Sequence, residues 1–253
     1  MTMLTIRSIL LDRKTLVLIV LLFLLLGIPG MWLVREGSTE KDAEMEVFMT
    51  IMILVYLQFI VLYTCLLYAS SLVSAETEER TMTYLISRPI SRFEILIYKY
   101  IGYVVSVFAI FALSTILNYI VLALHGGPVG FTRNLDMLGF TLGGVLIGVI
   151  GWGALFMLFA SVFKNPLMPG FLYSLFWESL LANAGGNISR ATFTYQIRTF
   201  IFNGLPRIGE DLSDGDLPVH GGHSPEMAFL VTVIAAVVML LMSWWFVRKR
   251  DFN

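Results

Sequence analysis

Residues 137–163, MLGFTLGGVLIGVIGWGALFMLFASVF, form one unbroken apolar run without a charged side chain. An α-helix rises 1.5 Å per residue, so about 20 residues cross a hydrocarbon layer of roughly 30 Å, and this run is long enough. No water is available in that layer to satisfy backbone N–H and C=O groups, which must therefore bond within the segment. The run is predicted to be a transmembrane α-helix.

Five further apolar blocks accompany this one. Hydrophobic residues make up 57% of the 253 residues and charged residues 14%, and the mean hydropathy is +0.81, which excludes a soluble core. The alternation typical of barrel strands is missing, as are internal repeats and linkers. We predict an all-α polytopic membrane protein, one domain over residues 1–253, with six transmembrane helices at about 15–34, 47–73, 95–124, 137–163, 167–184 and 227–247.

The distribution of basic residues predicts the orientation. In a six-span arrangement, 11 of the 17 Lys and Arg residues fall on the side that holds both termini and residues 74–99, and 6 fall on the other side. Cytoplasmic loops carry the excess of Lys and Arg, so both termini and the 74–99 segment are expected in the cytoplasm of a plasma-membrane protein. Residues 185–225 then form an extracytoplasmic loop, in which 192–202 is expected to lie at the membrane interface. The first apolar block is expected to be a retained helix, because no small-residue cleavage site follows it.

The most informative stretch for function is Ala75–Tyr103, AETEERTMTYLISRPISRFEILIYKYIGY. It resembles the cytoplasmic loop between the second and third helices of type-2 ABC transporter (ABC-2) permeases. Many family members have Gly where this chain has Arg80. The shared pattern is an acidic cluster, an apolar pair and a basic pair around a proline, followed by the start of the next helix: Glu76, Glu78, Glu79, Thr81, Met82, Leu85, Ile86, Arg88, Pro89, Ile90, Ser91, Arg92, Glu94, Ile95, Leu96, Lys99 and Gly102.

The resemblance implies that this loop is a coupling segment, a short helix that docks on a separate ATPase subunit. The charges at 76–80 suit a polar partner surface, and Met82, Leu85 and Ile86 give an apolar helical stripe. Pro89 would end that helix, because the residue before a proline prefers extended geometry. The alternative is that the basic residues only anchor the orientation. The predicted docking residues are Glu76, Glu78, Glu79, Arg80, Thr81, Met82, Leu85, Ile86, Arg88, Pro89 and Arg92.

Any energy for transport must come from a partner. The sequence contains no G-x-x-x-x-G-K-[ST] phosphate loop, so no cofactor is expected in this chain, and ATP and Mg would be bound by two ABC ATPase subunits. With about half the usual number of helices, the chain is expected to pair with a second copy of itself or a homologous permease within the lipid bilayer. An extracytoplasmic accessory protein is a further partner that the outer loop could accept, and no nucleic acid is expected.

Three polar residues inside the apolar blocks are candidates for lining a transport pathway: Gln58, Asn118 and Glu178. The alternatives are helix-to-helix hydrogen bonds for the two amides, and pairing with Arg190 or exposure to water for Glu178. The glycines of 137–163 allow close helix approach, which we expect to serve packing within the subunit more than a dimer seam. His220 and His223 are too few ligands for a metal site.

The leading interpretation is therefore the permease subunit of an ATP-driven transporter, with export as its direction. One alternative is a membrane anchoring, immunity or cofactor-maturation component that holds an ATPase without moving a conventional solute. An intramembrane enzyme is disfavoured, because the sequence has no G-x-S-x-G, no H-E-x-x-H and no histidine within a span. No catalytic residue is predicted.

Overall fold

The structure, a computed structural model, describes residues 2–10, 12, 14–22, 48–78, 92–123, 135–183, 188–205 and 223–249. Every regular element in these ranges is a helix, as the apolar blocks predicted. An unlabelled N-terminal helix covers 14–22, and three residues, 48–50, begin the helix that continues as η1. The other elements are α1 (Thr2–Leu10), η1 (Ile51–Val61), α4 (Leu62–Glu78), α6 (Arg92–Ala123), α8 (Leu135–Val162), α9 (Leu167–Tyr173), η2 (Ser174–Leu180), η3 (Leu181–Asn183), η4 (Ser189–Ala191), α10 (Phe193–Gly204) and α12 (Pro225–Lys249).

Four helices in the described ranges are long and apolar enough to cross a membrane: Phe48–Leu72, Phe93–Val121, Leu135–Val162 and Pro225–Lys249. They correspond to the second, third, fourth and sixth predicted spans. The first predicted span, 15–34, is helical as far as residue 22, and its remainder lies outside the described residues. The fifth, 167–184, is helical over α9, η2 and η3, and passes from α-helical to π-helical to 3₁₀ geometry. The described residues therefore form an all-helical bundle with four candidate spans, and a six-span arrangement stays a prediction.

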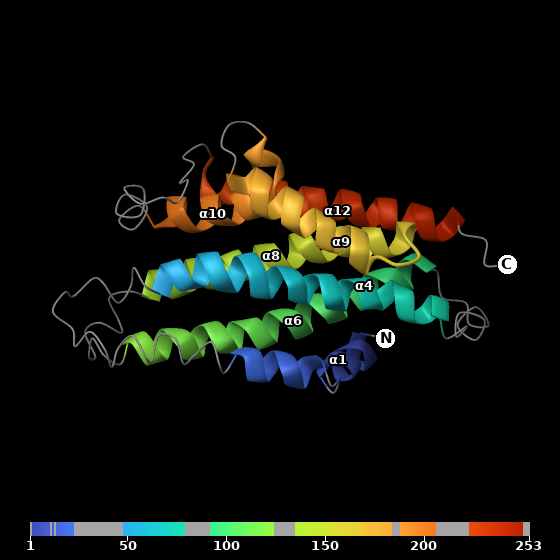
Figure 1. Ribbon diagram of the computed structural model, residues 1–253, viewed down its shortest axis with the longest axis horizontal. Coiled ribbons are helices and arrows are strands. Elements are labelled where there is room, and N and C mark those ends of the chain that lie inside the picture. The colour runs from blue at the N-terminus through green and yellow to red at the C-terminus, as the bar shows by residue number, and fades with distance from the viewer. Residues whose placement is uncertain are drawn as a thin grey trace.

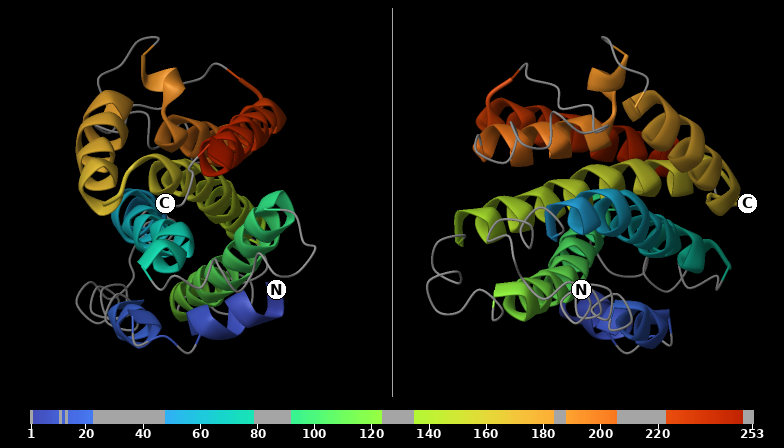
Figure 2. Two further views of the ribbon diagram at one scale, coloured as in Figure 1. Left: turned by 90° about the vertical axis from the view of Figure 1, so that its right-hand side faces the viewer. Right: turned by 60° about the vertical axis from the view of Figure 1, so that its left-hand side comes forward.

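Helix α8 lies at the centre of the bundle. It contacts α4 and α6 on one side and α10 and α12 on the other, as both views in Figure 2 show. Large aromatic side chains fill the space around it, and Trp152, Tyr103 and Phe156 are completely or almost completely buried. The apolar run 137–163 thus corresponds to α8, the helix at the core of the bundle.

The end of α4, the start of α6, the turn after α8 and the end of α12 lie at one end of the bundle (Figure 1). Helix α1 packs along α6 in the same half of the molecule. Arg248 and Lys249 form the last turn of α12, and Lys164 is exposed in the turn between α8 and α9. The opposite end carries α10 and the start of α12 (Figure 1).

Helix α10 differs from the interfacial helix expected at 192–202. It is packed between α8 and α12, and nine of its residues are buried. The glycines of α8 make this approach possible, because side chains of α10 occupy the space that a β-carbon would need. A β-carbon on Gly151 would lie 2.6 Å from Phe193 Cδ1, and one on Gly144 would lie 2.6 Å from Ile201 Cδ1. The glycines of α8 that face α10 therefore serve packing within the subunit, as predicted. They allow the amphipathic helix α10 to be buried against α8.

Candidate functional site

The predicted coupling segment falls mostly outside the described residues. Glu76 and Glu78 belong to the last turn of α4, and Arg92 begins α6; the structure gives their backbone only. The remaining docking residues lie in the range 79–91, beyond what the structure describes: Glu79, Arg80, Thr81, Met82, Leu85, Ile86, Arg88 and Pro89. Their role stays a prediction.

Helices α4 and α6, on either side of this segment, are linked by a hydrogen bond close to it. The Lys99 ammonium group donates to the backbone carbonyl of Leu72 at 3.2 Å, which links α6 to α4. Glu94 lies in the first turn of α6, where a negative charge interacts favourably with the positive end of the helix dipole. Residues 79–91 therefore connect two long helices, α4 and α6, whose ends lie at one end of the bundle (Figure 1).

A buried polar cluster lies toward the other end. We define the Glu178–Arg198 cluster as Gln58, Tyr173, Glu178, Asn183, Thr194 and Arg198. The Glu178 carboxylate is fully buried and sits at the N-terminus of α10. It accepts hydrogen bonds from the backbone N–H of Phe193 at 3.1 Å and of Thr194 at 2.9 Å, from the Thr194 hydroxyl at 2.7 Å and from the Tyr173 hydroxyl at 3.0 Å. A carboxylate here satisfies two free helix donors and complements the helix dipole.

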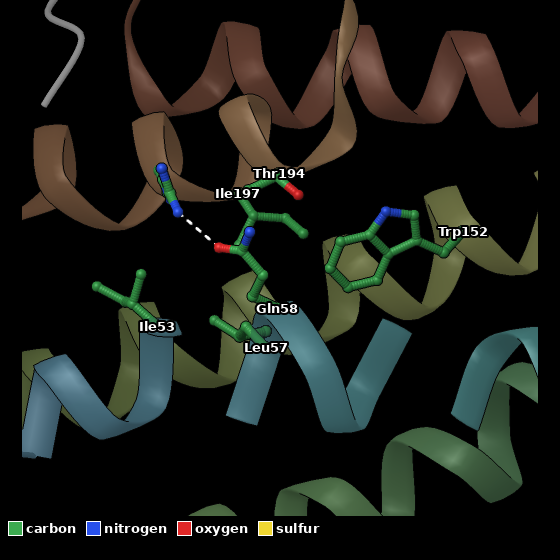
Figure 3. Close-up of a pocket in the computed structure, with 7 residues that line it drawn as sticks. Ile53, Leu57, Gln58, Trp152, Thr194 and Ile197 are labelled. Atoms are coloured by element: carbon green, nitrogen blue, oxygen red, sulfur yellow. Dashed lines mark hydrogen bonds between the residues drawn. The ribbon is translucent and has the colours of Figure 1, made fainter. Parts of the chain in front are cut away.

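Arg198 holds the next turn of α10. Its side chain is 6% exposed. One terminal nitrogen donates to Asn183 Oδ1 at 2.8 Å and the other to Gln58 Oε1 at 2.6 Å, the bond that the dashed line in Figure 3 marks. Helix α10 is therefore tied to η1 through Gln58, and to the α9–η3 helix through Glu178 and Asn183.

Both helices that receive α10 have π-helical geometry at the point of contact. Gln58 lies within η1 and Glu178 within η2. π-helical turns are rare and occur frequently at functional sites, because the wider turn redirects a side chain out of the regular helical pattern. Here the redirected side chains are the two polar ones that meet α10.

The alternatives for Glu178 are wrong. Its carboxylate is neither exposed to water nor paired with Arg190, because the N–H groups of Phe193 and Thr194 at the start of α10 lie directly against it. Arg190 instead contributes its backbone carbonyl, which accepts from the Gln196 amide at 2.9 Å. Asn118 lies apart from the cluster: its amide donates to Ser114 O at 2.9 Å within α6, and no hydrogen bond to the cluster is found among the described residues.

A small pocket adjoins the cluster between η1, α8 and α10, with room for about one water molecule, roughly 10 Å³. Figure 3 shows Gln58 and Leu57 rising from η1, Trp152 facing them from α8, and Thr194 and Ile197 above. Two buried donors here have no acceptor in the described structure: Trp152 Nε1 and Arg198 Nε. The pocket is lined by Ile53, Leu57, Gln58, Trp152, Thr194, Ile197 and Arg198.

Comparison with known protein families identifies the chain. Residues 11–177, about two thirds of it, match the model of the ABC-2 family transporter protein family. The chain belongs to this family. No curated protein matches it.

The match covers the predicted coupling segment, Gln58, the described helices through α9 and the start of η2, and it ends one residue before Glu178. The chain is thus a membrane protein of a transporter family whose membrane subunits are typically not catalytic. The described part of the chain holds no group of three or more His, Cys, Asp or Glu side chains that could bind a metal ion.

Sequence reasoning missed four residues of this ABC-2 protein's buried cluster: Tyr173, Asn183, Thr194 and Arg198. Arg198 was assigned to the outer loop as an orientation charge. One signal was available: apart from Arg198, the only residues of 193–202 that are neither apolar nor aromatic are Thr194, Gln196 and Thr199, so a helix that buried this segment would bury a cation. Nothing in the sequence paired it with Gln58, which lies 140 positions away.

Proposed function

We propose that the protein is the transmembrane permease subunit of an ATP-binding cassette exporter, coupled through residues 75–94 to a separate ATPase. The observation that carries the proposal is the family match over residues 11–177, combined with the position of this segment between two long apolar helices whose ends meet at one end of the bundle. Six spans, with both termini and the 75–94 segment in the cytoplasm of a plasma-membrane protein, complete the proposed arrangement.

The division of labour follows from what the sequence lacks. Without a phosphate loop, the chain takes its energy from ATP and Mg held in two partner ATPase subunits. Closure of those subunits would move the two coupling segments of a permease pair, and α4 and α6 would carry the movement into the membrane. The pair is formed with a second copy or a homologous permease. Export is proposed from the resemblance, in which most members move substrates outward.

Co-purification with the ATPase tests the docking. The double variant Glu79→Ala with Arg88→Ala should lose at least about tenfold of the recovered ATPase, because charged hydrogen bonds contribute about 1.5–3 kcal/mol each. Lys164→Ala, in the exposed turn between α8 and α9, is the matched control and should leave recovery unchanged. Unchanged recovery in the double variant would contradict coupling through this segment.

Two further measurements separate transport from its alternatives. Labelling of a cysteine introduced at Thr83, in a background where Cys65 is replaced by Ala, should occur from the cytoplasmic side, and a cysteine at His223 should react from outside. ATP hydrolysis by the purified complex should respond to added solutes if it transports them. A complex that binds the ATPase stably, yet shows no such response to any solute, would favour the anchoring function.

A further inference from the structure

The last turns of α12 carry two cations that lie over indole rings. The Lys249 ammonium nitrogen is 3.8 Å from the centre of the Trp245 ring, and the Arg248 guanidinium carbon is 5.8 Å from the centre of the Trp244 ring. Both basic residues are exposed. A ring face attracts a cation but supplies no oxygen acceptor, so the N–H donors of the ammonium and guanidinium groups can still bind an anion.

Lys249 continues the exposed apolar face of α12. This face is formed by side chains that follow one another at intervals of three or four residues, each at least 45% exposed: Ile234, Val238, Met242 and Trp245. Lys249 lies four residues beyond Trp245 and therefore on the same side of the helix. A Lys side chain at such a position lies along the apolar surface and keeps its charge at the edge. When hydrocarbon covers the apolar face, that edge is the level of the lipid phosphates.

Arg248 lies beside the junction of α12 with α6. Its ring partner, Trp244, packs edge to face with Phe93 at 5.5 Å between ring centres, and Phe93 is the second residue of α6. The end of α12 and the start of α6 lie at the same end of the bundle (Figure 1). Indole rings favour the boundary between hydrocarbon and water, because they combine an apolar body with a polar N–H. Two adjacent Trp residues thus indicate the level of the bilayer surface, and both cations follow one turn later.

We propose that the end of α12 binds the headgroups of anionic phospholipids, with their acyl chains along the exposed apolar face. The headgroup site is defined as Trp244, Trp245, Arg248 and Lys249. A zwitterionic headgroup carries its own cation next to the phosphate, so these two basic residues favour an anionic one. An acidic protein segment would match the cations but not the apolar side chains that extend back to Ile234. The site goes beyond the proposed transport function and does not depend on ATPase coupling.

Quenching of tryptophan fluorescence by brominated lipids tests the proposal. The full-length permease is placed in vesicles of equal amounts of phosphatidylglycerol and phosphatidylcholine, with bromine high on the acyl chains of one lipid or of the other. Trp32→Phe and Trp177→Phe form the parent background, which leaves the headgroup site and the fully buried Trp152 as the sources of fluorescence. Phosphatidylglycerol should be preferred about fivefold, because a basic residue near an anionic surface contributes about that factor. The preference should fall in high salt, which screens exposed charges.

Charge variants assign the preference to this site. Arg248→Gln with Lys249→Gln should bring the relative binding of the two lipids close to one. Arg7→Gln with Lys164→Gln is the matched control, because it removes two exposed cations elsewhere and should keep the preference of the parent. Arg248→Lys with Lys249→Arg keeps both charges and should also keep it. If the doubly neutral variant does not fold, Lys249→Gln alone should lower the preference about two- to fivefold.

The contrary outcomes are distinct. Equal quenching by the two brominated lipids in the parent overturns the proposal. An equal loss of preference in the site variant and in the Arg7 and Lys164 control also overturns it, because net charge would then explain the result. A loss of ATPase recovery in the site variant, with lipid preference unchanged, would assign the cations to a protein partner instead. The vesicles contain no ATPase, so failure of ATPase docking leaves these measurements unaffected and the two proposals fail separately.

Discussion

Helices α8 and α12 have similar length and hydropathy but occupy opposite kinds of position. Within their most apolar stretches, 72% of the residues of α8 are buried in the protein, against 22% for α12. Glycines of α8 admit side chains from two helices, α10 and α6, and α8 also contacts α4 and α12. Helix α12 buries one stripe of small residues and leaves large apolar side chains on the rest of its surface; the stripe is Ala228, Thr232, Ala236 and Ser243.

The difference shows what decides the place of a helix in a membrane bundle. Lipid tails are as apolar as leucine, so hydrophobicity alone does not draw one helix toward another. Packing does, and small residues allow it by letting backbones approach. Helix α8, whose glycines admit two neighbouring helices, is central, and helix α12, whose small residues form one stripe, is peripheral.

The largest expected effect tests whether the burial of α8 depends on α10. Glu178→Ala removes the acceptor for two backbone N–H groups and two hydroxyls, and leaves Arg198 without its nearest opposite charge. We expect the free energy of unfolding to fall by about 3 kcal/mol or more, measured by titration with a denaturing detergent. Glu226→Ala, at the exposed start of α12, should change it by less than about 0.5 kcal/mol. Equal effects of the two variants would mean that α10 is not held by its N-terminal cap.

A smaller decrease in the free energy of unfolding is expected when a side chain is added to a glycine of α8 that faces α10. Gly151→Val places methyl groups where the Phe193 ring lies, and Phe193 begins α10. Overpacking of this kind costs about 1–3 kcal/mol, which unfolding in detergent would measure. Gly139→Val is the matched control on the same helix, because nothing lies within 4 Å of a β-carbon there. If both variants lowered the free energy of unfolding equally, helix propensity and not the contact with α10 would account for the decrease.

The sequence could predict the helices of this protein more completely than their partners. Apolar length alone identified α8 and α12, and Ala75–Tyr103 pointed to the family that the comparison found. Glu178 was recognised as exceptional because a charge inside an apolar block has few physical explanations. Its contacts were not predictable, since they depend on α10 being packed inside the bundle against α8 and α12. The close fit of α10 on the glycines of α8 joins residues about 40–60 positions apart, and periodicity within either segment contains no record of it.

A still smaller decrease in the free energy of unfolding is expected when the side-chain hydrogen bond between α8 and α12 is removed. Ser161 of α8 and Ser243 of α12 are buried and lie 2.5 Å apart between their hydroxyl oxygens. Ser243→Ala removes this bond, and hydrogen bonds between membrane helices contribute about 0.6 kcal/mol on average. A double-mutant cycle with Ser161→Ala should give a coupling energy of that size. A coupling near zero would show that the stripe of small residues alone holds α12 to α8.

The smallest effect is expected on the outer face of α12. Ile234 is 62% exposed in the single subunit, so in detergent or lipid Ile234→Ala exchanges one apolar contact with the surroundings for another. The free energy of unfolding should change by less than about 0.5 kcal/mol, whereas Ala236→Leu, in the buried stripe, should cost about 1–3 kcal/mol by overpacking. A loss of more than about 1 kcal/mol for Ile234→Ala that disappears on dilution to the monomer would contradict a lipid-facing surface. It would place the second permease against α12, because only a concentration-dependent partner could bury this side chain.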